Sequence, residues 1–328
     1  MRLCRLTIIF VFALLAGCST GLDPFASLGV TTTTVSKNIV TGTGKVAGVV
    51  AQGSISKSIS MSKMKASANC AEQQNLQNSV GDIPAAGFQV DCSDLETDTA
   101  IGSGVTDSGG NFSIEVDGLV IETLAGLKAG RSMTAAFSIP IGCELKKDDK
   151  SVRKVGTITI DPTGAISISF GEVNSDSDLT AYALGVSDFR TANVFSRFSS
   201  LEDFRNRASA MSAGFASVTS DDVAKDDVSS KLAQIKSMYL GVFGGGVDLS
   251  GCPAGGKDDW GKALLGGTVS SYGCFDSVAE GASRFVGIEK SALTNAIGDA
   301  ATYVDQLETV ATTGFQEGAI GSSDSAED

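Results

Sequence analysis

The chain has 328 residues, of which 38 are acidic and 25 basic, and its formal net charge is −13. An acidic surface repels nucleic acid and anionic lipid, so the charge argues against nucleic-acid and phosphate ligands. The chain contains no histidine, which excludes Ser-His-Asp catalysis, Cys-His catalysis and a Cys/His zinc site.

The first 17 residues are predicted to be an export signal. Arg2 and Arg5 precede an apolar run at 6–16 of about 11 residues, which fits a secretory signal, whereas a membrane-spanning helix needs about 20. The run ends in "LAGC" at 15–18. This ending resembles the lipobox of bacterial lipoproteins, in which the signal is cleaved between the residues that match Gly17 and Cys18 after the cysteine is alkylated by a diacylglycerol. The alternative is an ordinary signal peptide with a chance cysteine.

The lipobox resemblance implies a mature protein that begins at Cys18 and is anchored by two or three acyl chains such as palmitate, and two chains are enough for stable anchoring. Ser19 follows the cysteine, and an uncharged residue there implies the outer membrane in Gram-negative lipoproteins. Loss of the signal removes two arginines and no acids, which changes the net charge from −13 to −15. The expected location is therefore the cell envelope, with the protein lipid-anchored at the outer membrane.

Cysteine usage agrees with export. Cys4 leaves with the signal and Cys18 is lipidated, so the remaining cysteines are Cys70, Cys92, Cys143, Cys252 and Cys274. An oxidising compartment favours disulfides, but an odd number leaves at least one thiol free or paired outside the chain. Cys252 and Cys274 lie in one Gly-rich segment and are the first predicted pair. Cys70 with Cys92 is the second, although Cys92 could as well pair with Cys143.

Residues 18–41 are rich in Thr, Ser and Gly and are predicted to be a tether. Apolar side chains then alternate with polar ones across 42–172, apart from a polar insertion at about 51–83. One example is "GTITIDPTGAISISF" at 156–170, which indicates a hairpin. Several short alternating strands joined by polar turns favour an antiparallel β-sandwich.

Two alternating rows carry cysteines. In "MTAAFSIPIGC" at 133–143 every second residue is small or apolar and the row ends in Cys143, while Phe88 and Val90 lead to Cys92 in the same way. Both cysteines are therefore expected to point into the core. On this pattern Cys143 is predicted to be the free thiol.

The β-rich half resembles a known family. It contains "VAGVV" at 46–50, "AGFQV" at 86–90, "TDSGGNFSI" at 106–114 and "GLKAGRSMTAAF" at 126–137. These segments resemble the transthyretin-like, carboxypeptidase-regulatory-type β-sandwich, whose T-D-x-x-G-x-F turn is complete here. Thr106 and Asp107 are expected to close the turn with side-chain hydrogen bonds, Gly110 to adopt positive φ and Phe112 to re-enter the core. The resemblance implies a non-catalytic module for adhesion, assembly or attachment, and the insertion departs from the short link of that family.

From 180 to 318 the apolar period becomes helical. Ser200 and Asp203 form a helix-start signal, and a stripe that runs from Leu293 to Ala311 repeats at spacings of three and four. A Gly-rich loop is expected at 241–273 and a solvated acidic tail at 319–328. The predicted fold class is α+β with two domains, an N-terminal antiparallel β-sandwich followed by a small C-terminal α-helical bundle.

One stretch has the spacing of a phosphate-binding loop. In "GCPAGGKDD", Gly251, Gly256 and Lys257 match G-x-x-x-x-G-K-[ST], but Asp258 stands where the motif needs a hydroxyl. A carboxylate there repels phosphate and cannot replace that hydroxyl ligand to magnesium. The stretch is therefore predicted to be a loop, and no nucleotide or other cofactor is expected.

Three other features have two interpretations each. "NSDSD" at 174–178, with Glu172 close by, offers calcium ligands, but a polar linker between the domains is preferred. Asp107, Gly109 and Asn111 are likewise expected to serve as a turn. The lone Trp260 could stack on a sugar, although packing against its own helix is preferred. No metal site is predicted.

The preferred function is a lipid-anchored cell-envelope protein that binds or assembles with an unidentified protein or glycan partner and has no catalytic residues. The alternative is a secreted hydrolase whose active site lies in the C-terminal domain, where paired acids converge in a cleft near Asp258, Asp259 and Asp276, with the sandwich as attachment module. Two buried carboxylates about 5 to 10 Å apart would favour the hydrolase.

Overall fold

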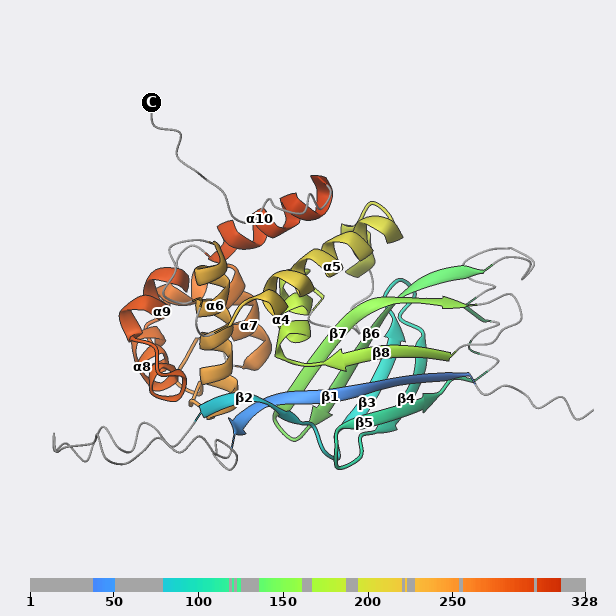
Figure 1. Ribbon diagram of the computed structural model, residues 1–328, viewed down its shortest axis with the longest axis horizontal. Coiled ribbons are helices and arrows are strands. Elements are labelled where there is room, and N and C mark those ends of the chain that lie inside the picture. The colour runs from blue at the N-terminus through green and yellow to red at the C-terminus, as the bar shows by residue number, and fades with distance from the viewer. Residues whose placement is uncertain are drawn as a thin grey trace, which may run out of the picture. The chain divides into compact units, whose positions relative to one another are not determined.

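The computed structural model describes residues 38–50, 79–117, 120, 123–124, 136–160, 167–186, 194–219, 222, 228–253, 256–297 and 300–313 (Figure 1). All of them belong to one compact unit, Lys37–Asp328. The predicted signal, the lipobox, nearly all of the tether and the acidic tail lie outside the described residues, as do Cys70 and most of the insertion. Residues 79–83, at the end of the predicted insertion, belong to a strand.

Strands come first along the chain and helices follow, so the α+β class is confirmed. The strands are β1 (Ile39–Val50), β2 (Ser79–Pro84), β3 (Gln89–Asp94), β4 (Ala100–Val105), β5 (Asn111–Glu115), β6 (Phe137–Lys147), β7 (Lys150–Ile160) and β8 (Ser167–Val173). The helices are α4 (Ser175–Ala183), α5 (Leu201–Ser217), α6 (Val228–Tyr239), α7 (Lys257–Leu265), α8 (Phe275–Val286), α9 (Lys290–Ile297) and α10 (Ala300–Thr313). Three short elements join them, η3 (Val194–Arg197), the π-helix η5 (Leu240–Gly244) and η6 (Thr268–Ser271).

The strands form two sheets of four. In the first, the long strand β1 pairs antiparallel with β5 along its first half and with β2 along its second half, while β8 pairs with it in parallel. The second sheet has the order β4-β3-β6-β7 and is antiparallel throughout. The predicted antiparallel arrangement thus holds for every strand pair except β1 with β8.

Alternating side chains of both sheets share one hydrophobic core. Most described residues of the predicted inward rows are buried, and β6 supplies Ile139 and Ile141 while β7 supplies Ile158 and Ile160; Phe137 is partly buried. Phe112 of β5 joins the same cluster. A period of two therefore identified the core face of these strands correctly.

The turn between β4 and β5 has the predicted chemistry. Asp107 accepts hydrogen bonds at Oδ1 from the backbone N–H groups of Gly109 and Asn111, both at 2.8 Å. Gly110 has φ of 84°, a conformation that favours glycine. Thr106 Oγ1 accepts a bond of 2.8 Å from the backbone N–H of Phe88, which ties the turn to β3.

A second core lies among the helices, where Phe204, Met211, Ile235 and Leu293 are fully buried. The predicted start of α5 is confirmed, because Ser200 is its N-cap and accepts from the backbone N–H of Asp203. Figure 1 shows the helices gathered beside the strands, and η5 and α8 contact β2.

The loop predicted at 241–273 is wrong, because this stretch holds most of η5 and all of α7 and η6. Its glycines obscured a short apolar face, which buries Trp260 and Leu264 in the helical core.

Candidate functional site

The outer edge of β7 meets the helices at a polar junction, which we call the seam: residues 151–153 of β7, the starts of α4 and α7, and the end of α6. An edge strand presents unpaired backbone groups, and here side chains of the helices satisfy them. The backbone N–H of Arg153 donates to Asp178 Oδ1 at 3.0 Å, and Ser177 Oγ donates to the carbonyl of Arg153 at 2.7 Å. Lys257 Nζ donates to the carbonyl of Ser151. The helices therefore bond directly to the edge of the sheet.

Asp178 is the centre of the seam. Its side chain is fully buried, and Oδ2 accepts from Lys257 Nζ at 2.8 Å and from the hydroxyl of Tyr239. Burial, and then the charge of Asp178, raise the pKa of Tyr239 well above its ordinary value of 10.0, so its hydroxyl stays protonated as a donor. Together with the Arg153 N–H, three donors converge on one carboxylate.

The linker predicted at 174–178 is therefore wrong. Asn174 is the N-cap of α4 and shares a capping box with Ser177, and the two acids of the stretch enter the fold rather than solvent. The calcium interpretation has no support either, because ammonium groups take the carboxylates: Lys236 pairs with Asp176 at 2.7 Å and Lys257 with Asp178. An Asn or Ser followed three residues later by a polar partner is a helix-start signal, and it could have identified this helix.

Arg153 connects a second set of partners. Its guanidinium, with a side chain 5% exposed, pairs with Glu144 at 2.9 Å and with Asp258 at 2.8 Å. It also donates to the hydroxyl of Tyr182 at 3.2 Å. Glu144 lies on the neighbouring strand β6, Tyr182 in α4 and Asp258 in the first turn of α7. One buried cation therefore links the sheet to two helices.

The pKa of Asp258 gives a test of this link. Burial raises that pKa, but the hydrogen bond and charge of Arg153 and the hydroxyl of Tyr182 outweigh burial and hold it below its ordinary value of 3.8. Such a group stabilises the fold fully above its unfolded-state pKa, and the contribution is lost as pH falls through the folded-state value. Because the side chain is 47% exposed, we expect Asp258→Asn to lower the free energy of unfolding by about 1 kcal/mol at most at neutral pH. The difference should shrink below about pH 3.8, as measured by urea unfolding; a constant difference at every pH would contradict the assignment.

Two of the three acids named in the hydrolase alternative line one hollow. Asp258 and Asp259 line a shallow hollow of about 290 Å³ that also contains Glu144. Asp276 does not line it; that acid lies at the start of α8 and pairs with Lys290 at 2.9 Å. Glu144 and Asp258 both pair with Arg153, and the lowered pKa of Asp258 is the opposite of what a general acid needs.

Lys257 and Trp260 both belong to α7. Gly256 is the N-cap of this helix, and the Lys257 ammonium lies over the rings of Tyr239 and Phe243 at 5.6 and 5.3 Å from their centroids. The ammonium bonds to Asp178 and Ser151. Trp260 is fully buried, and its ring lies 5.9 Å from that of Tyr272 between centroids, so it offers no exposed surface for stacking on a sugar.

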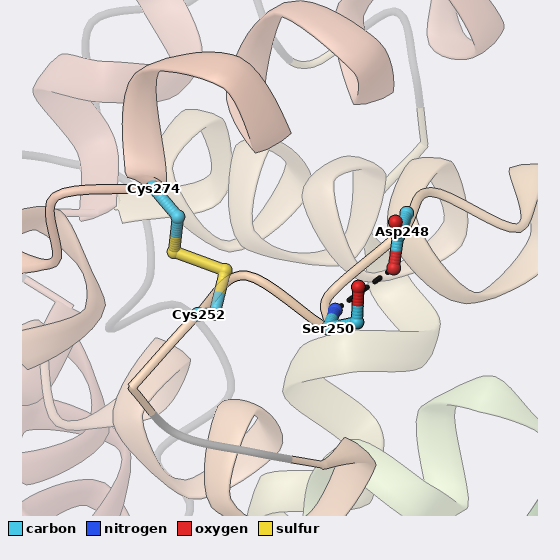
Figure 2. The surroundings of a disulfide bond; sticks show 4 residues. All are labelled: Asp248, Ser250, Cys252 and Cys274. Carbon is cyan, nitrogen blue, oxygen red and sulfur yellow. Dashed lines mark hydrogen bonds between the residues drawn. A yellow bond between two sulfur atoms is a disulfide. The ribbon is translucent and has the colours of Figure 1, made fainter.

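The structure contains two disulfides among the described residues. Cys252–Cys274 is confirmed, and it joins the segment after η5 to the start of α8 (Figure 2). The other bond joins Cys92 to Cys143, so the predicted free thiol at Cys143 and the Cys70–Cys92 pair are both wrong. The physical reason is the strand register: Cys92 of β3 lies directly opposite Cys143 of β6, with Cα atoms 4.1 Å apart.

A larger hollow of about 650 Å³ lies beside the seam. β1, the turn from β6 to β7, η5 with the segment that follows it, and the start of α7 contribute to its lining. It shares residues 149, 151, 256 and 257 with the smaller hollow, so the two adjoin. We call the two hollows together the groove. Sequence reasoning did not identify it, because its lining comes from four separate parts of the chain.

Comparison with known proteins adds no relative: no protein-family model, no curated protein and no solved structure matches the chain. In the described part of the chain, no helix has the length and hydropathy needed to cross a bilayer. No cluster of three or more acidic or cysteine side chains suited to a metal ion occurs there either.

Proposed function

We propose that this protein is a lipid-anchored component of a bacterial cell envelope, at the outer membrane, that acts by binding or assembly rather than by catalysis. The observation that carries the proposal is the "LAGC" sequence at 15–18, placed directly after an apolar run of export-signal length. The two disulfides support it, because disulfides persist in oxidising compartments outside the cytoplasm.

The non-catalytic role rests on the seam and on the β-rich half. The buried ionisable groups at the seam are bonded to one another, which suits a structural joint. We propose that the two sheets around their common core form a β-sandwich like the transthyretin-like modules, and that the helices form a second, C-terminal domain. The T-D-x-x-G-x-F turn between β4 and β5 supports that likeness. A protein or glycan is the partner class that such a module implies.

Lipidation tests the anchor directly. In cells fed radiolabelled palmitate, the wild-type chain should incorporate label and Cys18→Ser should incorporate none, because only the thiol of Cys18 is positioned to form the thioether. The variant should also leave the membrane fraction, since its acyl chains are lost.

Cys4→Ser is the matched control, because it removes a cysteine that departs with the signal. It should keep full labelling and membrane association. Label retained by Cys18→Ser, or absent from the wild type, would contradict the proposed anchor.

A further inference from the structure

The groove combines apolar walls with an acidic rim. Val46 and Val242 are buried in its lining, while Phe243, Val247 and Leu249 line it and remain partly exposed. Figure 2 shows the segment between Asp248 and Cys252, where Asp248 accepts from the backbone N–H of Ser250 at 2.8 Å and the disulfide anchors the far end. This wall is therefore held in place by a local hydrogen bond and a covalent bond.

The apolar wall depends on a close approach of η5 to β1. A side chain at Gly244 would place its Cβ 3.0 Å from the backbone nitrogen of Gly48, so any larger residue there would push the two backbones slightly apart. Single π-helical turns occur frequently at functional sites, and ligand sites favour junctions between packed units. The hollow is open to solvent rather than enclosed, which suits an extended chain better than a fully enclosed small molecule.

Negative charge predominates around the groove. Four exposed carboxylates and two exposed ammonium groups line it, and none of them forms an ion pair within the described part of the chain: Asp148, Asp149, Asp248, Asp259, Lys146 and Lys150. Deeper in, Arg153 and Lys257 are already paired with three carboxylates. The hydrogen bonds from Ser250 hold the pKa of Asp248 below its ordinary value.

We propose that the groove binds a basic peptide segment of a partner protein, whose apolar side chains contact Phe243, Val247 and Leu249 and whose Lys or Arg side chains face the carboxylates of the rim. Charge complementarity selects this occupant: an acidic rim attracts cations and repels anionic ligands. A wall of partly exposed apolar side chains supplies the contact area that a wholly polar segment could not use. The inference rests on the proposed function, because it supplies a partner class for a binding protein.

The test uses the full lipidated chain in a non-ionic detergent and three fluorescein-labelled heptapeptides, with binding measured by fluorescence anisotropy. The first has two leucines placed among lysines, the second replaces its lysines by glutamate, and the third replaces its leucines by serine. We expect the first to bind most tightly. Asp149→Lys should weaken it about fivefold, because it reverses an exposed charge. Leu249→Ser should weaken it by a similar factor, about fivefold, because it removes apolar contact.

Asp305→Lys is the matched control, since Asp305 is exposed on α10 and does not line the groove. It changes the total charge by the same amount as Asp149→Lys and should leave the affinity within about twofold. Equal binding of the lysine and glutamate peptides, an equal loss in the control, or no binding of any peptide would overturn the proposal. Palmitate labelling at Cys18 is read separately, so failure here is distinguishable from failure of the proposed anchor.

Discussion

Replacing Asp178 by alanine should lower the free energy of unfolding by about 3 to 5 kcal/mol, the cost of breaking a buried ion pair from one side. The carboxylate is fully buried and accepts from the backbone of Arg153, from Tyr239 and from Lys257. Its removal leaves all three donors near one another with no acceptor between them. Each buried donor without a partner costs about 1 to 3 kcal/mol. Urea unfolding followed by fluorescence measures the loss, because the only tryptophan, Trp260, is buried in the helical core.

Asp176 provides the comparison on the same helix. Burial raises the pKa of Asp176 more than the hydrogen bond and charge of Lys236 lower it. Folding therefore does not favour the ionised carboxylate of Asp176. Asp176→Ala should therefore cost clearly less than Asp178→Ala, about 1 kcal/mol. If the two variants lost equal stability, Asp178 would not be the centre of the seam.

A double variant separates the ion pair from the other bonds. Asp178→Leu and Lys257→Met together replace two opposite charges by apolar groups, and such pairs are often replaced at little cost. The double variant should be more stable than the sum of the single losses predicts, by about 1 kcal/mol or more. Additive losses would show that Lys257 and Asp178 contribute independently.

The contacts of the seam could not be predicted from the sequence. The alternation of Ser and Asp at 174–178 has the composition of a linker, and local composition carries no information about a cation elsewhere in the chain. Asp258 and Arg153 bond across a sequence separation of 105 residues. Inward rows such as Ile139 and Ile141 were predictable, because a period of two is a local property of the chain.

The pairing of the cysteines could not be predicted from local sequence either. Alternation correctly placed Cys92 and Cys143 in the core, where both are almost completely buried. It could not give the register of β3 against β6, and only that register sets the two sulfur atoms side by side. An inward thiol was therefore mistaken for a free one.

Removing this bond is the second large effect that we expect. Cys92→Ala with Cys143→Ala should lower the free energy of unfolding by about 4 kcal/mol, because the bond closes a loop with a sequence separation of 51 residues and restricts the unfolded chain. Cys252→Ala with Cys274→Ala opens a separation of 22 residues and should cost about 3 kcal/mol. Urea unfolding without reductant measures both variants. With reductant, both disulfides of every chain are open, so the free energy of unfolding of each variant should nearly equal that of the reduced wild type.

Single variants distinguish the two pairings of Cys92. With the bond between Cys92 and Cys143, Cys143→Ala should cost as much as Cys92→Ala, and Cys70→Ala should leave the free energy of unfolding within about 0.5 kcal/mol of wild type. A Cys70–Cys92 bond would give the opposite ranking, with Cys70→Ala as damaging as Cys92→Ala. Alkylation of free thiols before and after reduction checks the same point. Before reduction, Cys143→Ala should make the thiol of Cys92 available for alkylation, whereas Cys70→Ala should make no additional thiol available.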